Sequence, residues 1–166
     1  MAVFVIYTMA GNEDRIESEC RQRILRLGED VYVPKFDRLK RRHGEIKVIR
    51  DILFPGYIFW ETEDASDLRQ RLRKIPGLTK LLGAPEGVLK LYEEEERLIR
   101  KLCGKTHILD VSRGYIEGER VKVISGPLMG MDALICSVNR KKKRAVIRVE
   151  MFHKTVEVTV GLEVID

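Results

Sequence analysis

The stretch from residue 118 to residue 138 constrains the fold of this chain more than any other. Val121 and Val123 alternate with charged residues, the period of two that is typical of a half-buried strand. Gly126 can take the positive φ angle that a compact loop needs, and Pro127 fixes φ at the next position. The stretch therefore predicts two strands joined by a glycine-proline turn, with an ordinary hairpin turn as the simpler alternative.

Two further strand patterns complete a β-rich region. Apolar residues alternate with polar ones in 133–138, the second strand of the stretch above, and again in 145–149 and 156–160. Closing several short strands into a barrel removes exposed strand edges. We therefore expect a small β-barrel at residues 114–166, near the lower size limit for a domain that folds alone.

The region before this barrel alternates strand and helix patterns. Residues 3–9 are rich in β-branched and aromatic residues, as in a buried strand. Asn12 is placed to cap a helix that ends at Gly28. The apolar stripe of this helix is Ile16, Cys20, Ile24 and Leu27. The other predicted elements are a hairpin with strands at 31–39 and 46–51, a strand around 57–60, a helix at 65–75, a short strand at 78–82 and a helix at 92–102. This order is that of a split-βαβ sheet, ferredoxin-like, with an extra hairpin, so we expect an α+β fold.

The length of the chain fits two small domains. The 166 residues, 44% of them apolar, allow one domain of average size or two small ones. The segment 104–114 is the most suitable linker, because it separates the last predicted helix from the first barrel strand. We therefore predict an N-terminal domain at 1–104, a linker at 105–113 and a barrel domain at 114–166.

Charge and cysteine content limit the classes of partner. With 31 Lys and Arg against 26 Asp and Glu the net charge is +5, which is compatible with nucleic acid. Three scattered cysteines without a C-x-x-C pair argue against a disulfide scaffold or structural zinc, and indicate buried thiols in a reducing compartment. No apolar run approaches the roughly 18 residues of a membrane span. We expect a soluble, cytoplasmic protein with no metal or cofactor.

The C-terminal strand-turn-strand stretch has the pattern Gly118-x-x-Val121-x-Val123-x-x-Gly126-Pro127-Leu128-x-Gly130-x-x-Ala133. This pattern resembles the KOW motif of small β-barrels in ribosomal proteins and in the NusG/Spt5 transcription elongation factors. The resemblance implies nucleic acid and its polymerases as partners.

The first hundred residues resemble the NusG N-terminal domain, which binds RNA polymerase in that family. The segment Phe54-Pro55-Gly56-Tyr57 matches the family's F-P-G-Y signature residue for residue. The strand Val3-Phe4-Val5-Ile6-Tyr7 with Gly11-x-Glu13 is similar to the family's opening strand and helix start, and Ile75-Pro76-Gly77-Leu78 with Leu82-Gly83-Ala84-Pro85 is similar to the stretch after its second helix. The resemblance covers nearly the whole chain.

The chain also departs from general NusG proteins. Met151-Phe152-His153-Lys154 stands where the family's I-F-G-R turn contacts ribosomal protein S10, and His153 replaces its glycine. Val3 replaces a usual tryptophan, and Leu128-Met129-Gly130-Met131 stands where many members carry phenylalanine. These departures resemble a specialised antitermination paralogue of the LoaP type. A housekeeping NusG-type factor that couples polymerase to S10 is the alternative.

The resemblance implies two kinds of binding surface. Tyr7, Phe54, Pro55 and Tyr57 would form an apolar patch that grips a helix of the polymerase clamp, unless some of them only fill the core. Met151, Phe152 and Lys154 would contact the partner of the barrel. Bridging the polymerase cleft in this way would suppress pausing.

Basic residues form three candidate nucleic-acid sites. Cations at these positions would contact phosphates, chiefly of nascent RNA, although a charge run is often only a solvated surface. The weakest group, on the first helix, is a candidate for single-stranded DNA of the transcription bubble. The groups are Arg38, Lys40, Arg41 and Arg42 with His43; Arg140, Lys141, Lys142, Lys143 and Arg144; and Arg21, Gln22 and Arg23.

An enzyme is the main rival class. The sequence contains no Walker A loop, H-E-x-x-H, G-x-S-x-G or paired-cysteine zinc pattern, and its three histidines lie in unrelated segments. We therefore expect no catalytic residues. A KOW-containing ribosome-associated protein would explain the barrel and the basic turn, but not the segment 54–57.

Overall fold

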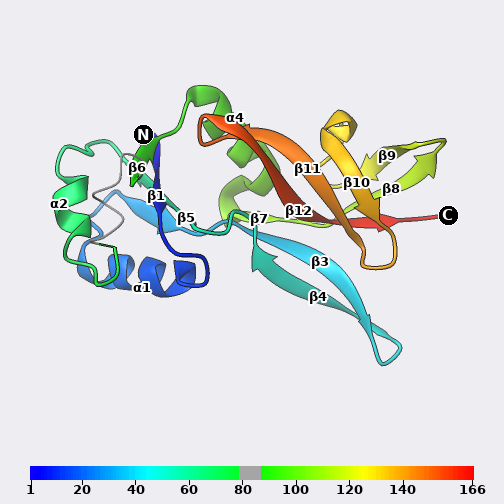
Figure 1. Ribbon diagram of the computed structural model, residues 1–166, viewed down its shortest axis with the longest axis horizontal. Coiled ribbons are helices and arrows are strands. Elements are labelled where there is room, and N and C mark those ends of the chain that lie inside the picture. The colour runs from blue at the N-terminus through cyan, green and yellow to red at the C-terminus, as the bar shows by residue number, and fades with distance from the viewer. Residues whose placement is uncertain (79–86) are drawn as a thin grey trace. The chain divides into compact units, whose positions relative to one another are not determined.

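A computed structural model of the chain describes residues 1–78 and 87–166 (Figure 1). The described residues form two compact units, one from 1–33 and 54–96 and the other from 34–53 and 97–166. Helices and several sheets are combined, which confirms the predicted α+β class. The predicted domains and linker concern independent folding and stay a prediction. The predicted strand at 78–82 and the segment Leu82-Gly83-Ala84-Pro85 extend into residues 79–86, outside the described residues.

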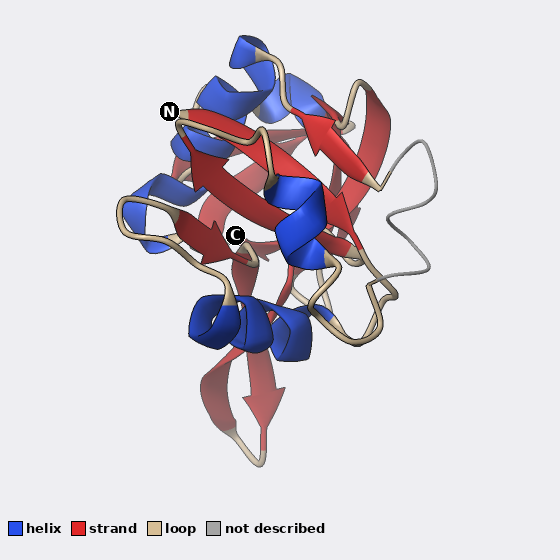
Figure 2. Cartoon of the chain, turned by 90° about the vertical axis from the view of Figure 1, so that its left-hand side faces the viewer, coloured by secondary structure: helices blue, strands red, loops and turns tan. Residues whose placement is uncertain are grey.

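The first unit is built on one antiparallel sheet. In its described part the strand order is β2-β5-β1-β6, formed by Asp30–Tyr32, Tyr57–Thr62, Ala2–Tyr7 and Val88–Lys90. Both β1 and β2 pair antiparallel to β5, so they run parallel to each other with β5 inserted between them. The helix α1, Glu13–Arg23, connects β1 to β2 and contacts β2 and β5. This is the split-βαβ order. Figure 2 shows the helices of the chain in blue and its strands in red.

The core of the first unit comes from the inner faces of these elements. The side chains of Ile6, Ile58, Phe59 and Trp60 on the central strands are completely buried. Ile16 and Cys20 of α1 are buried as the apolar stripe predicts. The second helix, α2, spans only Leu68–Leu72, and both of its leucines are buried.

Two expectations for α1 were wrong in detail. Leu27 was placed on the buried stripe, but it is fully exposed because the helix already ends at Arg23. Asn12 occupies the N-cap position, yet its side chain makes no capping hydrogen bond. The side chain of Glu13 instead accepts a hydrogen bond from the backbone N–H of Gly11, just before the helix, at 2.7 Å.

The second unit contains a long hairpin and a larger sheet. The hairpin strands β3, Lys35–Arg42, and β4, Glu45–Ile52, meet at a two-residue turn, and β3 also pairs parallel to β7, Ile108–Leu109 (Figure 1). At the turn, His43 and Gly44 both have positive φ angles, as a type I′ turn requires. The expected strand at 31–39 is wrong in its bounds, because it divides into β2 and β3, which belong to different sheets. The hairpin strands extend further toward the tip than predicted, so the basic tip belongs to regular strands. The helix α4, Glu93–Cys103, runs from the first unit into the second and is followed by a short 3₁₀ turn, η1, at Gly104–Thr106.

The larger sheet has the order β10-β11-β12-β8-β9 in the described chain. Its strands are β8, Ser112–Glu117; β9, Arg120–Ser125; β10, Ile135–Asn139; β11, Arg144–Met151; and β12, Lys154–Val164, with a 3₁₀ turn, η2, at Asp132–Leu134. All neighbours are antiparallel except β12 and β8, which are parallel. Alternate residues of β11 are buried, as the period of two predicts.

The glycine-proline turn after β9 packs tightly on β8. Gly126 has a φ angle of +98°, and a Cβ there would lie 2.6 Å from the Cα of Ser112. The hydroxyl of Ser112 accepts a hydrogen bond from the N–H of Leu128 at 3.0 Å, and both residues are completely buried. Glycine is therefore required at position 126 for its conformation and for this close approach.

Candidate functional site

The end of β1 and the start of β5 carry a pair of tyrosines. Tyr7 and Tyr57 are cross-strand partners, and their rings meet edge to face with centroids 5.4 Å apart. Tyr7 is 43% exposed, Tyr57 is half-buried and the adjacent Pro55 is exposed. These three residues are the accessible part of the predicted patch, and we call them the aromatic surface.

Phe54 lies beneath this surface and not in it. Its side chain is 2% exposed, and its ring packs against Phe59 with centroids 5.8 Å apart. The turn that closes with a hydrogen bond from the N–H of Tyr57 to the carbonyl of Phe54 leaves Phe54 inside and Pro55 outside. The expectation that Phe54 would be an exposed anchor is therefore wrong, because its side chain fills the core.

A buried carboxylate holds the aromatic surface in place. Glu13, 1% exposed, accepts hydrogen bonds from the N–H of Gly11 at 2.7 Å and from the N–H of Gly56 at 2.8 Å. The carbonyl of Gly56 in turn accepts a hydrogen bond from the N–H of Thr8 at 2.8 Å. The G-x-E and F-P-G-Y segments, far apart in the sequence, are thus joined at one carboxylate. Sequence reasoning missed this role of Glu13, which it used only as a helix-start residue.

A basic groove of about 730 Å³ lies in the second unit. One wall comes from β3 and the other from the turn between β10 and β11, which are the first two predicted basic groups. The structure thus brings together two groups that the sequence could only treat as separate. The residues that line the groove are Arg38, Leu39, Lys40, Arg41, Lys141, Lys142, Lys143 and Arg144.

The two walls meet because β12 crosses β3 without a side chain between them. A Cβ at Gly161 of β12 would clash with the carbonyl oxygen of Asp37 and come within 3.0 Å of the Cα of Arg38. Gly161 is the cross-strand partner of Arg144, and the next residue, Leu162, donates its N–H to the carbonyl of Lys143 at 3.1 Å. The backbone contact at Gly161 therefore fixes the basic turn beside β3.

The cations of the groove differ in their exposure and in their contacts with carboxylates. Lys40, Arg41, Lys141 and Lys142 are exposed. Arg38 is held by the carboxylate of Asp51 at 2.8 Å, and Lys143 lies 3.9 Å from a carboxylate oxygen of Glu163. The four exposed cations have the greatest freedom to contact an anion.

Two predicted cations lie outside the lining of this groove. Arg140 pairs with the carboxylate of Asp166 at 3.1 Å. Arg42 ends β3 at the hairpin turn and is exposed. Both flank the groove along the chain, so they belong to its surroundings and not to its walls.

Comparison with known proteins gives the family of this chain. A family model described as "Transcription termination factor nusG" matches residues 1–102. The chain belongs to the NusG family. The predicted family is thereby confirmed, and the matched residues include the aromatic surface, Glu13 and the hairpin wall of the basic groove.

Curated relatives extend the similarity to most of the chain. The "Transcription termination/antitermination protein NusG" of Thermus thermophilus is 27% identical over 163 residues, which cover 90% of this chain and 89% of that protein. Proteins of the same name from Bacillus subtilis and Staphylococcus epidermidis are 25% and 24% identical; each alignment covers 98% of this chain, with 96% and 93% of the relative.

The third basic group of this NusG-family chain lies in the first unit, on α1. Arg21, Gln22 and Arg23 are exposed. The guanidinium of Arg21 pairs with Asp30 at 3.2 Å and donates to the carbonyl of Val31, so it anchors the helix to β2. Gln22 contacts the hydroxyl of Ser18 at 3.3 Å. Their contact with DNA stays a prediction.

The turn expected to contact the partner of the barrel joins β11 to β12. The side chains of Met151 and Phe152 are 0% and 6% exposed, so they belong to the core. Phe152 and His153 both have positive φ angles, which form a type I′ turn without glycine. His153 and Lys154 are the exposed residues of this turn.

The cysteines follow the expectation only in part. Burial raises the pKa of the Cys20 thiol to about 12, with smaller contributions from Glu19 and Glu17, and burial also raises the pKa of Cys103 to about 12. Cys136 is exposed, which contradicts the expectation of buried thiols. Over residues 1–78 and 87–166, no His, Cys, Asp and Glu side chains cluster as a metal site, and no helix is long and apolar enough to cross a membrane.

Proposed function

We propose that this NusG-family protein is a transcription elongation and antitermination factor. In this proposal the aromatic surface binds the clamp region of RNA polymerase, and the basic groove binds nascent RNA. The observation that carries it is the groove itself, where seven cations from two distant segments line one cavity. Like charges held so close repel one another, and an anionic partner removes that repulsion.

The aromatic surface has the chemistry of a protein contact. Tyr7, Pro55 and Tyr57 present apolar rings together with two hydroxyl groups, and exposed tyrosines often act as anchors at protein interfaces. The carboxylate of Glu13 holds Gly56 between them, so the surface is formed before the partner arrives. By bridging the polymerase cleft, the protein would suppress pausing and termination without catalysing a reaction.

The groove suits a phosphate backbone better than a base. Its lining among the described residues is seven cations and Leu39, with no aromatic ring on which a base could stack. Phosphate contacts raise affinity without reading sequence. Any preference for one RNA must come from neighbouring residues or from RNA shape.

We further propose that the larger sheet of the second unit is a KOW-type barrel and that the protein is a specialised, LoaP-like paralogue. The tight packing of Gly126 on Ser112 and the buried Leu128 give a physical reason for the glycine-proline pattern of the motif. A partner at the turn of His153 and Lys154 would be ribosomal protein S10 in the housekeeping alternative. The basic groove favours RNA recruitment instead.

Polymerase capture tests the first half of the proposal. Tyr7→Ala should weaken retention of the full-length protein on purified RNA polymerase while the melting temperature stays close to that of the wild type. Phe54→Ala is unsuitable for this test, since truncating a buried phenylalanine costs about 3–5 kcal/mol of stability. Arg15→Ala, which changes an exposed residue of α1, is the matched control. Retention unaffected by Tyr7→Ala would refute the aromatic surface.

A reconstituted terminator assay tests the second half. The wild-type protein should increase readthrough, and the combined change Lys141→Ala, Lys142→Ala should reduce it without changing polymerase retention. Co-purification with ribosomal subunits in place of polymerase would support the ribosome-associated alternative. Binding to S10 with no effect of the lysine changes would support the housekeeping one.

A further inference from the structure

The strand β4 of the hairpin is an edge strand. In the described chain it pairs only with β3, in a register that continues without interruption from Glu45 to Ile52. Figure 1 shows β4 on the outer side of the hairpin. The strand contains neither the proline nor the bulge that often protects an exposed edge, so its free side can accept another strand.

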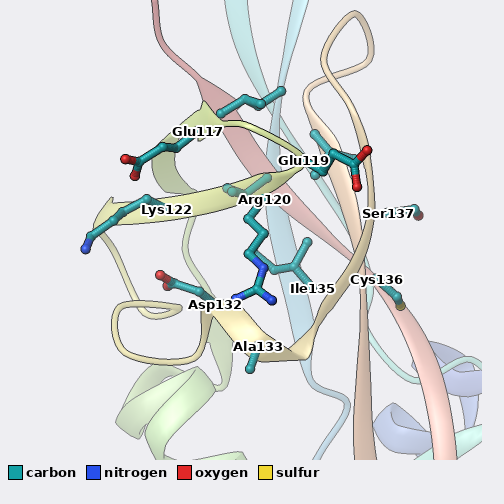
Figure 3. A pocket seen from close by; sticks show the side chains of 12 residues that line it. Glu117, Glu119, Arg120, Lys122, Asp132, Ala133, Ile135, Cys136 and Ser137 are labelled. Atoms are coloured by element: carbon teal, nitrogen blue, oxygen red, sulfur yellow. The ribbon is translucent and has the colours of Figure 1, made fainter.

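The edges of β9 and β10 in the same unit do not select a partner by charge. Figure 3 shows the groove between them, of about 790 Å³, lined by side chains of both signs. They include Glu117, Glu119 and Asp132 as well as Arg120 and Lys122. Such a mixture favours neither an acidic nor a basic segment, whereas the charges of β4 discriminate between possible pairings.

The free backbone groups of β4 belong to its even-numbered residues. The N–H of Leu53 donates to the carbonyl of Pro34 at 2.9 Å, which places a hydrogen-bonded pair of the hairpin at these two residues. Because such pairs alternate along an antiparallel ladder, the odd-numbered residues of β4 bond to β3. The N–H and C=O groups that point to the free side are those of Ile46, Val48, Arg50 and Ile52.

Exposed apolar side chains lie on the same strand. Ile46 is 49% exposed and Val48 is 58% exposed, although β-branched residues are favoured where a strand is covered. A strand added beside β4 would remove part of this apolar surface from water, which is favourable. Both the backbone and the side chains of β4 therefore suit a further strand.

We propose that β4 pairs antiparallel with β4 of a second copy of this chain, about a two-fold axis at Ile49. Since only even-numbered residues have free backbone groups, an even-numbered residue must face another, and the axis passes through a residue. An axis at Lys47 or at Arg50 would bring two like charges together on the axis. An axis at Val48 would set Glu45 against Asp51 of the second copy, which is also repulsive.

The axis at Ile49 gives complementary contacts instead. Lys47 then faces Asp51 of the second copy, and by symmetry this pair of opposite charges forms twice. Ile46 faces Ile52 of the second copy, also twice, and the two Ile49 side chains meet on the axis. The sequence of β4 is thus self-complementary in this one central register.

The register also offsets a like-charge contact within the hairpin. Lys47 and Lys40 are cross-strand partners, an unfavourable arrangement for two lysines. Asp51 of the second copy would bring a carboxylate beside them. The Asp51 side chain is 44% exposed next to Arg38, so it can contact a second cation.

The other charges of the hairpin stay paired or lie outside the interface. The guanidinium of Arg50 keeps the carboxylate of Asp37 at 2.8 Å. Glu45 lies at the turn, opposite Arg42 and beyond the paired residues 46–52. The basic groove lies on the other side of β3, where β12 approaches it, so this inference does not depend on the proposed RNA site.

Sedimentation of the full-length protein over a range of concentrations tests the inference. We expect a reversible dimer, and Lys47→Asp should weaken it about tenfold or more, because both symmetric pairs become repulsive. This change also removes the contact between two lysines, so the monomer should stay folded. Adding Asp51→Lys restores opposite charges and should restore the dimer. Lys122→Asp, at an exposed position of β9, is the matched control and should have no effect.

A disulfide cross-link tests the position of the axis. In this register the Cα atoms of residue 49 in the two copies lie about 4.5 Å apart, within the span of a disulfide. Ile49→Cys should therefore link two copies on oxidation, in a Cys136→Ser background because Cys136 is exposed. Ile46→Cys is more exposed but faces Ile52, so it should not link.

Three results would overturn this proposal. One is a protein that stays monomeric at every concentration that remains soluble. Another is a dimer that the combined exchange of Lys47 and Asp51 fails to restore, or that links through Ile46→Cys and not through Ile49→Cys. The third is a monomer whose β4 amides become protected from hydrogen exchange only when RNA polymerase is added, because a partner protein would then cover the edge.

Discussion

The composite basic groove makes a quantitative prediction about salt. Each phosphate contact on single-stranded RNA adds about 0.7 to the slope of log affinity against log salt. The exposed cations divide into Lys40 and Arg41 on the hairpin wall and Lys141 and Lys142 on the turn. Alanine at either pair removes up to two contacts, so the slope should fall by about 1.4, and by about 2.8 when both pairs are changed.

Fluorescence anisotropy of a labelled single-stranded RNA, titrated at several salt concentrations, measures these slopes. The substitutions are on the surface, where changes usually alter stability by less than about 0.5 kcal/mol, so circular dichroism should show an unchanged fold. Lys122→Ala combined with Arg148→Ala removes two positive charges, as each pair variant does, but from other surfaces of the second unit. That control should change the slope much less, because these cations lie outside the groove.

The Lys40→Ala, Arg41→Ala variant distinguishes a composite RNA site from a site on the turn alone. If a single RNA lies in one groove, the hairpin and turn variants lower the slope of the same binding event by similar amounts. A wild-type slope in the Lys40→Ala, Arg41→Ala variant would refute the composite site and leave the turn as the RNA contact. Equal losses in the control would mean that only the net charge matters.

Three further predictions concern the parts that support these surfaces. Glu13→Ala should cost about 1–3 kcal/mol, because it leaves the buried N–H of Gly56 unpaired and removes the partly buried bond to Gly11. Glu13→Gln should cost less, and chemical denaturation measures both. Gly161→Ala should lower the free energy of unfolding by about 1–3 kcal/mol, because the added methyl group overpacks the contact with β3. It should also weaken RNA binding, because it separates β12 from β3. Wild-type RNA affinity in this variant would contradict the prediction. Burial alone would raise the pKa of Glu29, but hydrogen bonds led by that from Arg71 lower it from 4.5 to about 2. The stabilisation, up to about 3 kcal/mol, is therefore complete above pH 4.5 and lost as the pH falls toward 2; in Glu29→Gln, unfolding titrations should lose this pH dependence.

Local patterns in the sequence predicted the family and several strands, since those signals are local, but they did not predict β6, β7 or β8. The alternation of residues 145–149 gave the buried face of β11, and the segment 54–57 pointed to the family that the comparison confirmed. The alternation of apolar and polar residues indicates which side chains share a face of a strand. It does not state which strands pair, so the parallel contacts of β3 with β7 and of β12 with β8 were not foreseen.

The candidate sites were harder to predict because exposure depends on turns. Phe54 and Tyr57 belong to the same aromatic segment, yet the turn between them buries the first and leaves the second partly exposed. Met151 resembles a surface contact by its position in a turn, but it continues the buried face of β11. Glu13 gave no signal as a buried group, since a glutamate in a first helical turn is usually exposed and favourable there.

The basic groove also bears on how the chain can be divided. One wall lies in β3, within the residues matched by the family model, and the other lies beyond residue 102. A fragment restricted to the predicted barrel, 114–166, would keep Lys141 and Lys142 but lose Lys40 and Arg41. It would also expose the surface of β12 around Gly161 that β3 covers. Because a bound RNA would contact both walls, its binding would stabilise the β3–β12 contact itself, so the RNA site and the fold of the second unit are thermodynamically linked.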